Sequence, residues 1–319
     1  MFPCRVARCA VKEGAKSMNL NNLYYFKVMA EFQHYTRAAQ SLCITQPSLS
    51  HAIASLERDL GVKLFRKEGR NVTLTKYGLM LQSYVSQGFH DIEVGDRLLR
   101  QFSRKNSGII DLSFLVILGY KFLPQLIKRF YEDPAHEGIT VNFSPNDSRT
   151  AIGKLKEGDI DLCLCTYVPD EPDIEFTPLV RQELVCIVAN RHPLAKRKSV
   201  LVEELLAYPI IRYIDTAGEI QLLIDQLFAD CGGAPSSLYT LLEEITMAGI
   251  VSTGYRDCFA VVPDLEILQH YAIKKIPIQH PGACRNIFLA ASRKHPHAPC
   301  VELFKDYTIH FAAGSAGGI

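Results

Sequence analysis

The chain has 319 residues, of which 48% are hydrophobic and 22% are charged, and its formal net charge at pH 7 is +1. This is the composition of an ordinary soluble protein, and the length predicts two or three domains. No apolar run is long enough to cross a bilayer, and charged residues interrupt the N-terminus where a signal peptide needs a continuous apolar stretch; both features exclude a membrane partner and favour the cytoplasm. The ten cysteines are too scattered for a disulfide scaffold.

The charge is unevenly distributed along the chain. Residues 1–17 and 18–76 carry +3 and +4, so the remainder carries −6. A basic end on an acidic body favours a polyanionic partner for that end alone.

Three short helices are predicted after Met18. Apolar residues at helical spacing mark the first, and the second is expected over residues 36–42 with Thr36 as its N-cap. The third is expected to begin at Thr45-Gln46-Pro47, since proline is favoured in the first turn, and to end at Gly61, since glycine is favoured just past a helix. The short connection between the second and third helices predicts a helix-turn-helix.

A hairpin and a long helix follow. Two short apolar segments flank Glu68-Gly69-Arg70-Asn71, which is a hairpin signal. Thr75 then begins an amphipathic pattern that runs to Phe102, and its unusual length indicates a dimerising or spacer helix. A polar linker over residues 103–108 ends it.

Beyond Gly108 the pattern becomes an alternation of apolar strands and amphipathic helices. Strands without polar alternation, flanked by helices, predict a parallel sheet covered on both faces. Two such α/β units joined by crossing segments would leave a cleft between them. The expected strands cover residues 109–116, 139–143, 160–165, 183–189, 210–211 and 259–262, and the expected helices cover 122–131, 149–157, 219–230 and 243–251.

Polar and basic side chains gather on the helix-turn-helix and the hairpin. Glutamine can pair with adenine, and serine can contact bases or phosphates, although Gln and Ser at a helix start can also be caps only. Basic residues on a hairpin suit a wing laid along a phosphate backbone, and a helix N-terminus can hold phosphate. The predicted DNA-contacting residues are Thr36, Arg37, Gln46, Pro47, Ser48, Ser50, His51, Arg66, Lys67 and Arg70.

This region resembles the signature of LysR-type transcriptional regulators in the order and spacing of its residues. A second likeness at His192-Pro193-Leu194-Ala195 and Ser199-Val200 extends the resemblance over nearly the whole chain from Met18. The residues that carry the first likeness are Thr36-Arg37-Ala38-Ala39, Leu42, Gln46-Pro47, Ser50, Ile53, Leu56-Glu57, Leu60-Gly61, Leu64-Phe65, Gly69-Arg70, Leu74-Thr75 and Gly78.

The resemblance implies an α/β protein with an N-terminal winged helix-turn-helix, a long linker helix and two Rossmann-like lobes of the periplasmic-binding-protein type. It further implies double-stranded DNA and a small-molecule effector as partners, a homodimer through the linker helix, and a homotetramer. The implied parts are an N-terminal extension (1–17), a DNA-binding domain (18–76), a linker helix (77–107), an effector-binding domain (108–311, with lobe 1 at 108–180 and 281–311 and lobe 2 at 181–280) and a disordered tail (312–319).

The sequence departs from the family pattern in places. Lys67 stands where the family usually has arginine, which alters bidentate phosphate geometry. His34-Tyr35 replaces the serine that often precedes the Thr-Arg-Ala-Ala motif. Gly254-Tyr255-Arg256-Asp257-Cys258 departs from the family's glycine pair in a region that borders the cleft, so the identity of the effector is not carried over.

Effector contacts are expected at the C-terminal ends of the parallel strands and at helix starts. By resemblance, Ser148 matches a position that often contacts the effector. Arg149 and Arg212 would suit an anionic ligand, unless each is solvated or paired within the protein, and serine and threonine here can be caps only. The predicted effector-contacting residues are Ile117, Gly119, Ser148, Arg149, Thr166, Arg212 and Thr216.

Other chemistry has weaker support. His295-Pro296-His297 has metal-like spacing but lacks a fourth ligand, and Cys163 and Cys165 have the spacing of core thiols on one face of a strand. There is no nucleophile elbow, phosphate loop or dinucleotide fingerprint, so we predict no metal, no cofactor and no catalysis. The alternatives are a binding protein whose helix-turn-helix no longer contacts DNA, and an enzyme built on the α/β lobes.

Overall fold

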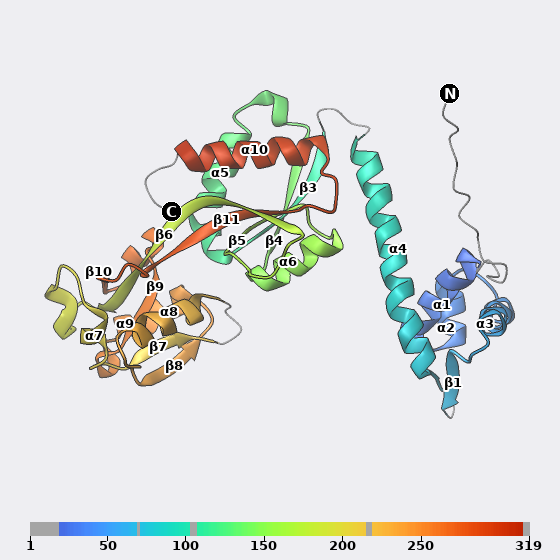
Figure 1. Ribbon diagram of the computed structural model, residues 1–319, viewed down its shortest axis with the longest axis horizontal. Coiled ribbons are helices and arrows are strands. Elements are labelled where there is room, and N and C mark those ends of the chain that lie inside the picture. The colour runs from blue at the N-terminus through green and yellow to red at the C-terminus, as the bar shows by residue number, and fades with distance from the viewer. Residues whose placement is uncertain (1–18, 69–70, 103–106, 215–218, 315–319) are drawn as a thin grey trace, which may run out of the picture. The chain divides into compact units, whose positions relative to one another are not determined.

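The computed structural model describes residues 19–68, 71–102, 107–214 and 219–314 (Figure 1). The chain divides into two compact units, residues 1–95 and 96–319, and each is described by itself. The predicted N-terminal extension lies outside the described residues.

The first unit is a three-helix bundle followed by a hairpin and the start of a long helix (Figure 1). Its centre is apolar: Phe26 and Met29 from the first helix pack with Leu49, Ile53 and Leu56 from the third, and all five are almost completely buried. The elements are α1 (Leu20–Phe32), α2 (Tyr35–Ser41), α3 (Gln46–Leu60), β1 (Phe65–Glu68), β2 (Asn71–Leu74) and α4 (Lys76–Phe102).

The ends of α3 follow the sequence prediction. The Thr45 hydroxyl accepts a hydrogen bond from the Ser48 backbone N–H, and Gly61 takes the left-handed conformation (φ 71°) that ends the helix. The start of α2 does not follow it. His34 is the N-cap, because its Nδ1 accepts from the Arg37 N–H at 3.4 Å, and Thr36 already lies inside the helix. The prediction of Thr36 as cap was therefore wrong by two residues.

The second unit is a mixed sheet with helices on both faces. Within the described residues, strand order is β4-β3-β5-β11-β6-β9-β7-β8, with β10 paired to β6. The strands are β3 (Gly108–Phe114), β4 (Ile139–Pro145), β5 (Leu162–Cys165), β6 (Ile174–Ala189), β7 (Ile210–Tyr213), β8 (Ser237–Leu241), β9 (Phe259–Pro263), β10 (Ile273–Pro277) and β11 (Cys284–Ser292). The helices are α5 (Phe122–Phe130), α6 (Ser148–Glu157), α7 (Val202–Leu205), α8 (Glu219–Asp230), α9 (Glu244–Ser252) and α10 (Pro299–Gly314), with a 3-10 helix η1 (Val116–Tyr120) after β3.

Two lobes form around this sheet (Figure 1). In lobe 1, β3 pairs in parallel with β4 and β5, and in lobe 2, β7 pairs in parallel with β8 and β9. The long strands β6 and β11 pass between the lobes and pair antiparallel to each other. The expectation of a parallel sheet therefore holds within each lobe. It fails at the crossing strands, because β6 and β11 run in opposite directions.

Burial of β5 on both faces explains its uninterrupted apolar sequence. Successive side chains of a strand point to opposite faces. Leu162 and Leu164 join the large core beneath α5 and α10, whereas Cys163 and Cys165 join the separate core beneath α6. The two thiols are thus core residues, and a hydrogen bond with Cys163, together with burial, raises the pKa of Cys165 far above its ordinary value.

Two boundaries differ from the prediction. β6 begins at Ile174, well before the expected residue 183, because its first half pairs with β11. Helix α10 extends to Gly314, so Ala312 and Ala313 are helical and the prediction of disorder from residue 312 was wrong there. Residues 315–319 lie outside the described residues. No helix of the described chain combines the length and apolar character that a membrane span requires.

Candidate functional site

The outer face of α3 presents polar side chains. Gln46, Pro47, Ser48 and His51 are exposed and Ser50 is half-buried, while Leu49 (0% exposed) and Ile53 (1%) face the core. The Ser48 hydroxyl lies 2.8 Å from the Thr45 hydroxyl, so Ser48 also takes part in the cap. The helix is therefore held by one apolar face and leaves the opposite face open to a ligand.

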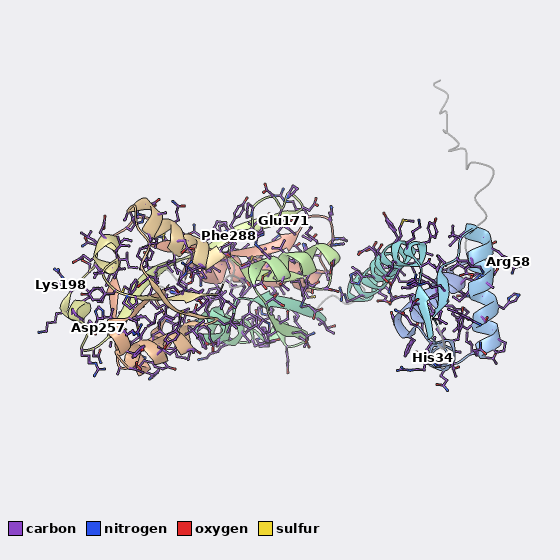
Figure 2. The ribbon with its side chains drawn as sticks, turned by 90° about the horizontal axis from the view of Figure 1, so that it is seen from below. His34, Arg58, Glu171, Lys198, Asp257 and Phe288 are labelled. Atoms are coloured by element: carbon purple, nitrogen blue, oxygen red, sulfur yellow. The ribbon has the colours of Figure 1, made fainter. Side chains whose placement is uncertain are left out.

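This exposed face continues to the end of α3. Ala54 and Arg58 are exposed, and Arg58 Nε lies 3.4 Å from the Ala54 carbonyl oxygen. Figure 2 shows Arg58 on the outer side of the helix. Arg58 was not among the predicted DNA contacts, although its position seven residues after His51 places the two on the same helix face.

The basic residues of the hairpin are also exposed. Lys67 projects from β1, and Arg66 Nε donates to Thr73 Oγ1 of β2 at 3.2 Å, which braces its guanidinium across the hairpin. Thr36 and Arg37 are exposed at the first turn of α2. Arg70 lies outside the described residues.

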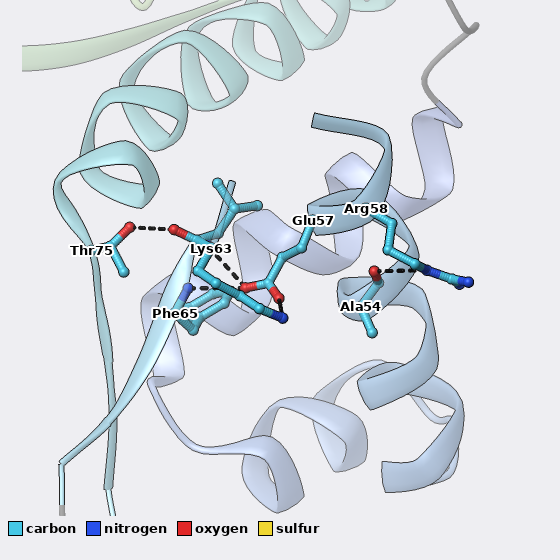
Figure 3. A network of polar contacts seen from close by, with 7 residues as sticks. Ala54, Glu57, Arg58, Lys63, Phe65 and Thr75 are labelled. Carbon is cyan, nitrogen blue, oxygen red and sulfur yellow. Dashed lines mark hydrogen bonds and ion pairs between the residues drawn. The ribbon is translucent and has the colours of Figure 1, made fainter. Parts of the chain in front are cut away.

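A buried carboxylate joins α3 to the hairpin (Figure 3). Glu57 is only 7% exposed, and its Oε1 accepts from the backbone N–H groups of Leu64 (2.9 Å) and Phe65 (3.3 Å). Its Oε2 accepts from Lys63 Nζ at 2.6 Å. On the other side, Thr75 Oγ1 donates to the Lys63 carbonyl oxygen at 2.6 Å. These bonds fix where β1 begins relative to the end of α3.

The second unit contains a cavity of about 410 Å³. One wall comes from the ends of β3 and β4 in lobe 1, and the other from the end of β7 and the starts of α8 and α9 in lobe 2. The lining residues are Leu115, Val116, Ile117, Pro145, Asn146, Asp147, Tyr213, Ile220, Leu242, Glu243, Glu244 and Arg285.

Charged groups occupy the lobe 2 side of this cavity. Tyr213 Oη donates to Glu244 Oε1 at 2.9 Å, and Arg285 Nε donates to Gln182 Oε1 at 2.8 Å. Burial raises the pKa values of the Glu244 carboxyl and the Tyr213 hydroxyl, and burial lowers the pKa of the Arg285 guanidinium. Both acidic and basic groups are therefore partly removed from water at this site.

Family models match both units. Residues 20–79 match the model described as "Bacterial regulatory helix-turn-helix protein, lysR family", and residues 103–312 match the "LysR substrate binding domain". The chain belongs to the LysR family of transcriptional regulators. An uncharacterized HTH-type transcriptional regulator of Bacillus subtilis, YybE, is 33% identical over 296 residues, which span 92% of this chain and the whole of the relative. The regulator BenM of Acinetobacter baylyi is 26% identical over 86% of this chain and 90% of the relative.

Solved structures agree with this assignment. The effector-binding domain of QuiR, determined in complex with shikimate, is 36% identical, with a TM-score of 0.62 over 66% of this chain and all of that domain. Full-length CbnR in complex with its target DNA is 21% identical, with a TM-score of 0.55 over 92% of this chain and all of that chain, which is a likeness of fold. This chain is thus a LysR-type helix-turn-helix regulator with an effector-binding domain.

The cavity of this LysR-type regulator includes one of the predicted effector residues among those described, Ile117. Ser148 and Thr166 are buried, and their hydroxyls lie 2.8 Å apart; the Thr166 N–H also donates to Ser148 Oγ. Arg149 is exposed. These three residues do not belong to the described lining, and neither does Gly119, which lies in η1.

Arg212 and the C-terminal side of α9 also lie outside that lining. Arg212 forms two 2.8 Å hydrogen bonds to the Asp225 carboxylate, which is the internal pairing considered as its alternative. Thr216 lies outside the described residues. The loop over residues 254–258 follows the C-terminal end of α9, whereas the cavity is lined by the N-terminal end of α9. Figure 2 shows Asp257 at one end of the unit.

The charged side of the cavity was not predicted from the sequence. Arg285, Glu244 and Tyr213 come from three separate segments, and nothing local marks an arginine on a crossing strand as a cavity residue. The histidines of the His295-Pro296-His297 segment instead contact backbone oxygens, His295 Nε2 that of Lys156 and His297 Nε2 that of Ser292. Among the described residues, no group of three or more metal-binding side chains is present.

Proposed function

We propose that α3 reads the major groove of a duplex while the β1–β2 hairpin lies along the phosphate backbone. The observation that carries this proposal is the division of α3, in which Leu49 and Ile53 are buried and the polar face from Gln46 to Arg58 is exposed. On this proposal Gln46, Pro47, Ser48, Ser50 and His51 face the bases, while Thr36, Arg37, Arg66, Lys67 and Arg70 contact phosphates.

The test is a selection of bound duplexes from a random DNA library, followed by titration of the selected duplex at several salt concentrations. The parent should enrich a defined motif, and its affinity should fall steeply with salt as counterions are released. Lys128→Ala is a matched control, because it removes an exposed cation from α5 in the other unit and should leave both results unchanged. Failure to enrich any motif would overturn the proposal.

We infer further that α4 forms a homodimer, and that dimers pair into tetramers. Apolar side chains are exposed along this helix, including Leu79, Met80, Tyr84 (75% exposed), Ile92 and Leu99. An amphipathic helix with so many exposed apolar residues suits pairing with a second copy. Sedimentation of the parent and of Ile92→Glu tests this, since the variant should shift toward a smaller species.

The cavity between the lobes would hold the effector. Its volume of about 410 Å³ lies in the usual range for small-molecule sites, roughly 300–1,000 Å³. The support for this role comes from the lining contributed by both lobes, since a ligand there would favour one arrangement of the lobes over another. We infer no catalytic step, and we expect the regulator to act in the cytoplasm, where bacterial DNA lies. The six other effector-contacting residues predicted from the sequence, Gly119, Ser148, Arg149, Thr166, Arg212 and Thr216, stay predictions.

A further inference from the structure

A salt bridge joins the two lobes of the second unit. Lys121 of lobe 1 and Glu266 of lobe 2 are far apart in the sequence, yet Lys121 Nζ lies 3.0 Å from Glu266 Oε2. The two side chains are 35% and 61% exposed, so the pair lies at the surface. Because the partners belong to different lobes, the distance between them depends on how the lobes are arranged.

Each partner is attached to a short helix that is anchored by a buried leucine. Lys121 directly follows η1, in which Leu118 is 0% exposed. Glu266 begins the 3-10 helix η6 (Glu266–His270), in which Leu268 is also 0% exposed. Both leucines belong to the large apolar core of the unit. The salt bridge therefore connects two fixed parts of the structure, and its length follows the positions of the lobes.

The cavity wall and the salt bridge share one segment. Val116 and Ile117, at the start of η1, line the cavity, and Lys121 follows the end of the same helix. Since η1 is only five residues long, the lining residues and Lys121 move together. A change in the lobe arrangement that alters the cavity therefore also alters the distance between Lys121 and Glu266.

Lobe 2 presents further negative charge to this segment. Burial raises the pKa of the Tyr120 hydroxyl, and the neighbouring carboxylates of Glu243 and Glu244 raise it further. Both carboxylates line the cavity from lobe 2. Lys121, next to Tyr120 in the sequence, thus brings a positive charge of lobe 1 to an acidic edge of lobe 2, and its charge attracts the two lobes to each other.

We propose that the salt bridge between Lys121 and Glu266 is a latch that holds the two lobes in the arrangement seen here and so favours this form of the cavity. This inference rests on the effector role proposed for the cavity and names a residue pair that regulates it. An exposed salt bridge shifts an equilibrium by about two- to fivefold. The latch therefore biases the lobes without locking them, and the binding free energy of a ligand is large enough to overcome it.

Hydrogen–deuterium exchange of the full chain tests the latch, because amide exchange reports how often a segment opens. The variants are Lys121→Met, Glu266→Gln and the double variant, each compared with the parent. In each single variant, residues 115–121 and residues 264–270 should both exchange about two- to fivefold faster, so the effect should reach the lobe that carries no substitution. The double variant should exchange no faster than the faster single variant, since either substitution already removes the salt bridge.

Three controls accompany this measurement. Lys128→Met removes an exposed cation of α5, also in lobe 1, that forms no ion pair in the described part of the chain, and it should exchange as the parent does. At about 1 M salt the ratio of variant to parent rates should fall toward one, because ions screen an exposed pair. Exchange of the buried strand β5 should be unchanged in every variant, which checks that the fold is kept.

The proposal is overturned if both single variants exchange as the parent does, if faster exchange is confined to the substituted lobe, or if the two effects add in the double variant. Faster exchange of β5 as well would mean a general loss of stability, and it also rejects the latch. No ligand is added, so the result does not depend on which effector binds. Failure of this test with motif enrichment intact rejects the latch alone, whereas absence of enrichment in the parent rejects the DNA-binding proposal.

Discussion

The two units of this regulator arrange their functional side chains in opposite ways. In the first unit the proposed DNA contacts lie on α2, α3 and the hairpin, most of the described ones are exposed, and neighbours in sequence are neighbours in space. In the second unit the lining of the cavity comes from segments scattered between Leu115 and Arg285, and its key groups are partly buried. The first site therefore depends on the placement of rigid elements, and the second on the pairing of distant strands.

Placement in the first unit depends on Glu57, and its loss should give the largest effect. Glu57→Ala leaves the Leu64 and Phe65 N–H groups without their acceptor and Lys63 without its partner. Removal of a buried charged acceptor should lower the free energy of unfolding by about 2–4 kcal/mol. Urea denaturation of the parent and the variant measures this difference.

A conservative variant sharpens this prediction. Glu57→Gln keeps an acceptor oxygen for the backbone but loses the charge, so it should lie between the parent and the alanine variant. Duplex affinity should fall with Glu57→Ala even where the protein is fully folded, since the hairpin would no longer be fixed against α3. A folded alanine variant with parental stability and affinity would show that the hairpin is positioned by other contacts.

The next largest effect should be on DNA binding, where variants of groove-contacting and backbone-contacting residues should behave differently. Gln46→Ala should relax base preference at one position of the selected duplex by about 1–3 kcal/mol, because a bidentate contact to a base would be lost. Lys67→Ala should instead weaken binding to all duplexes alike and reduce the salt slope by about one, since it would contact phosphate. Equal behaviour of the two variants would contradict the assignment of α3 to the groove.

The contrast between the units also explains what could be predicted from the sequence. Thr45, Pro47 and Gly61 act on their own helix, so local rules located the ends of α3. The start of α2 was misplaced because the His34 ring can cap a helix as a threonine hydroxyl does. Arg285 could not be predicted as a cavity residue from the sequence. Its position in the cavity depends on the register of β11 against β6, which is fixed by the packing of both lobes.

Ser148 and Arg149 are adjacent predicted residues whose environments differ. The Ser148 hydroxyl accepts from the buried Thr166 N–H and contacts its side chain, whereas Arg149 is exposed. Ser148→Ala should lower the free energy of unfolding by about 1–2 kcal/mol, and Arg149→Ala should change it by less than about 0.5 kcal/mol. Thermal unfolding of both variants measures the difference. If Arg149→Ala were the more damaging change, the hydroxyl pair would not be what stabilises the start of α6.

The smallest effect should come from Glu244, and its sign depends on pH. Burial raises the pKa of the Glu244 carboxyl above its ordinary value of 4.5, so the folded protein holds this proton more tightly than the unfolded chain does. The stability contributed by the protonated form is complete below the unfolded pKa and is lost as the pH rises through the folded pKa.

Glu244→Gln stays neutral and still accepts the Tyr213 hydroxyl, so its stability relative to the parent should increase as the pH is raised from 4.5 toward 8. Glu243→Gln, at the adjacent exposed position, is the matched control for loss of a carboxylate at the start of α9. Thermal unfolding of the three proteins across this range measures the trend, and a Glu244→Gln difference that shrinks with rising pH would mean that the ionised carboxylate is stabilised by Arg285 more than burial disfavours it.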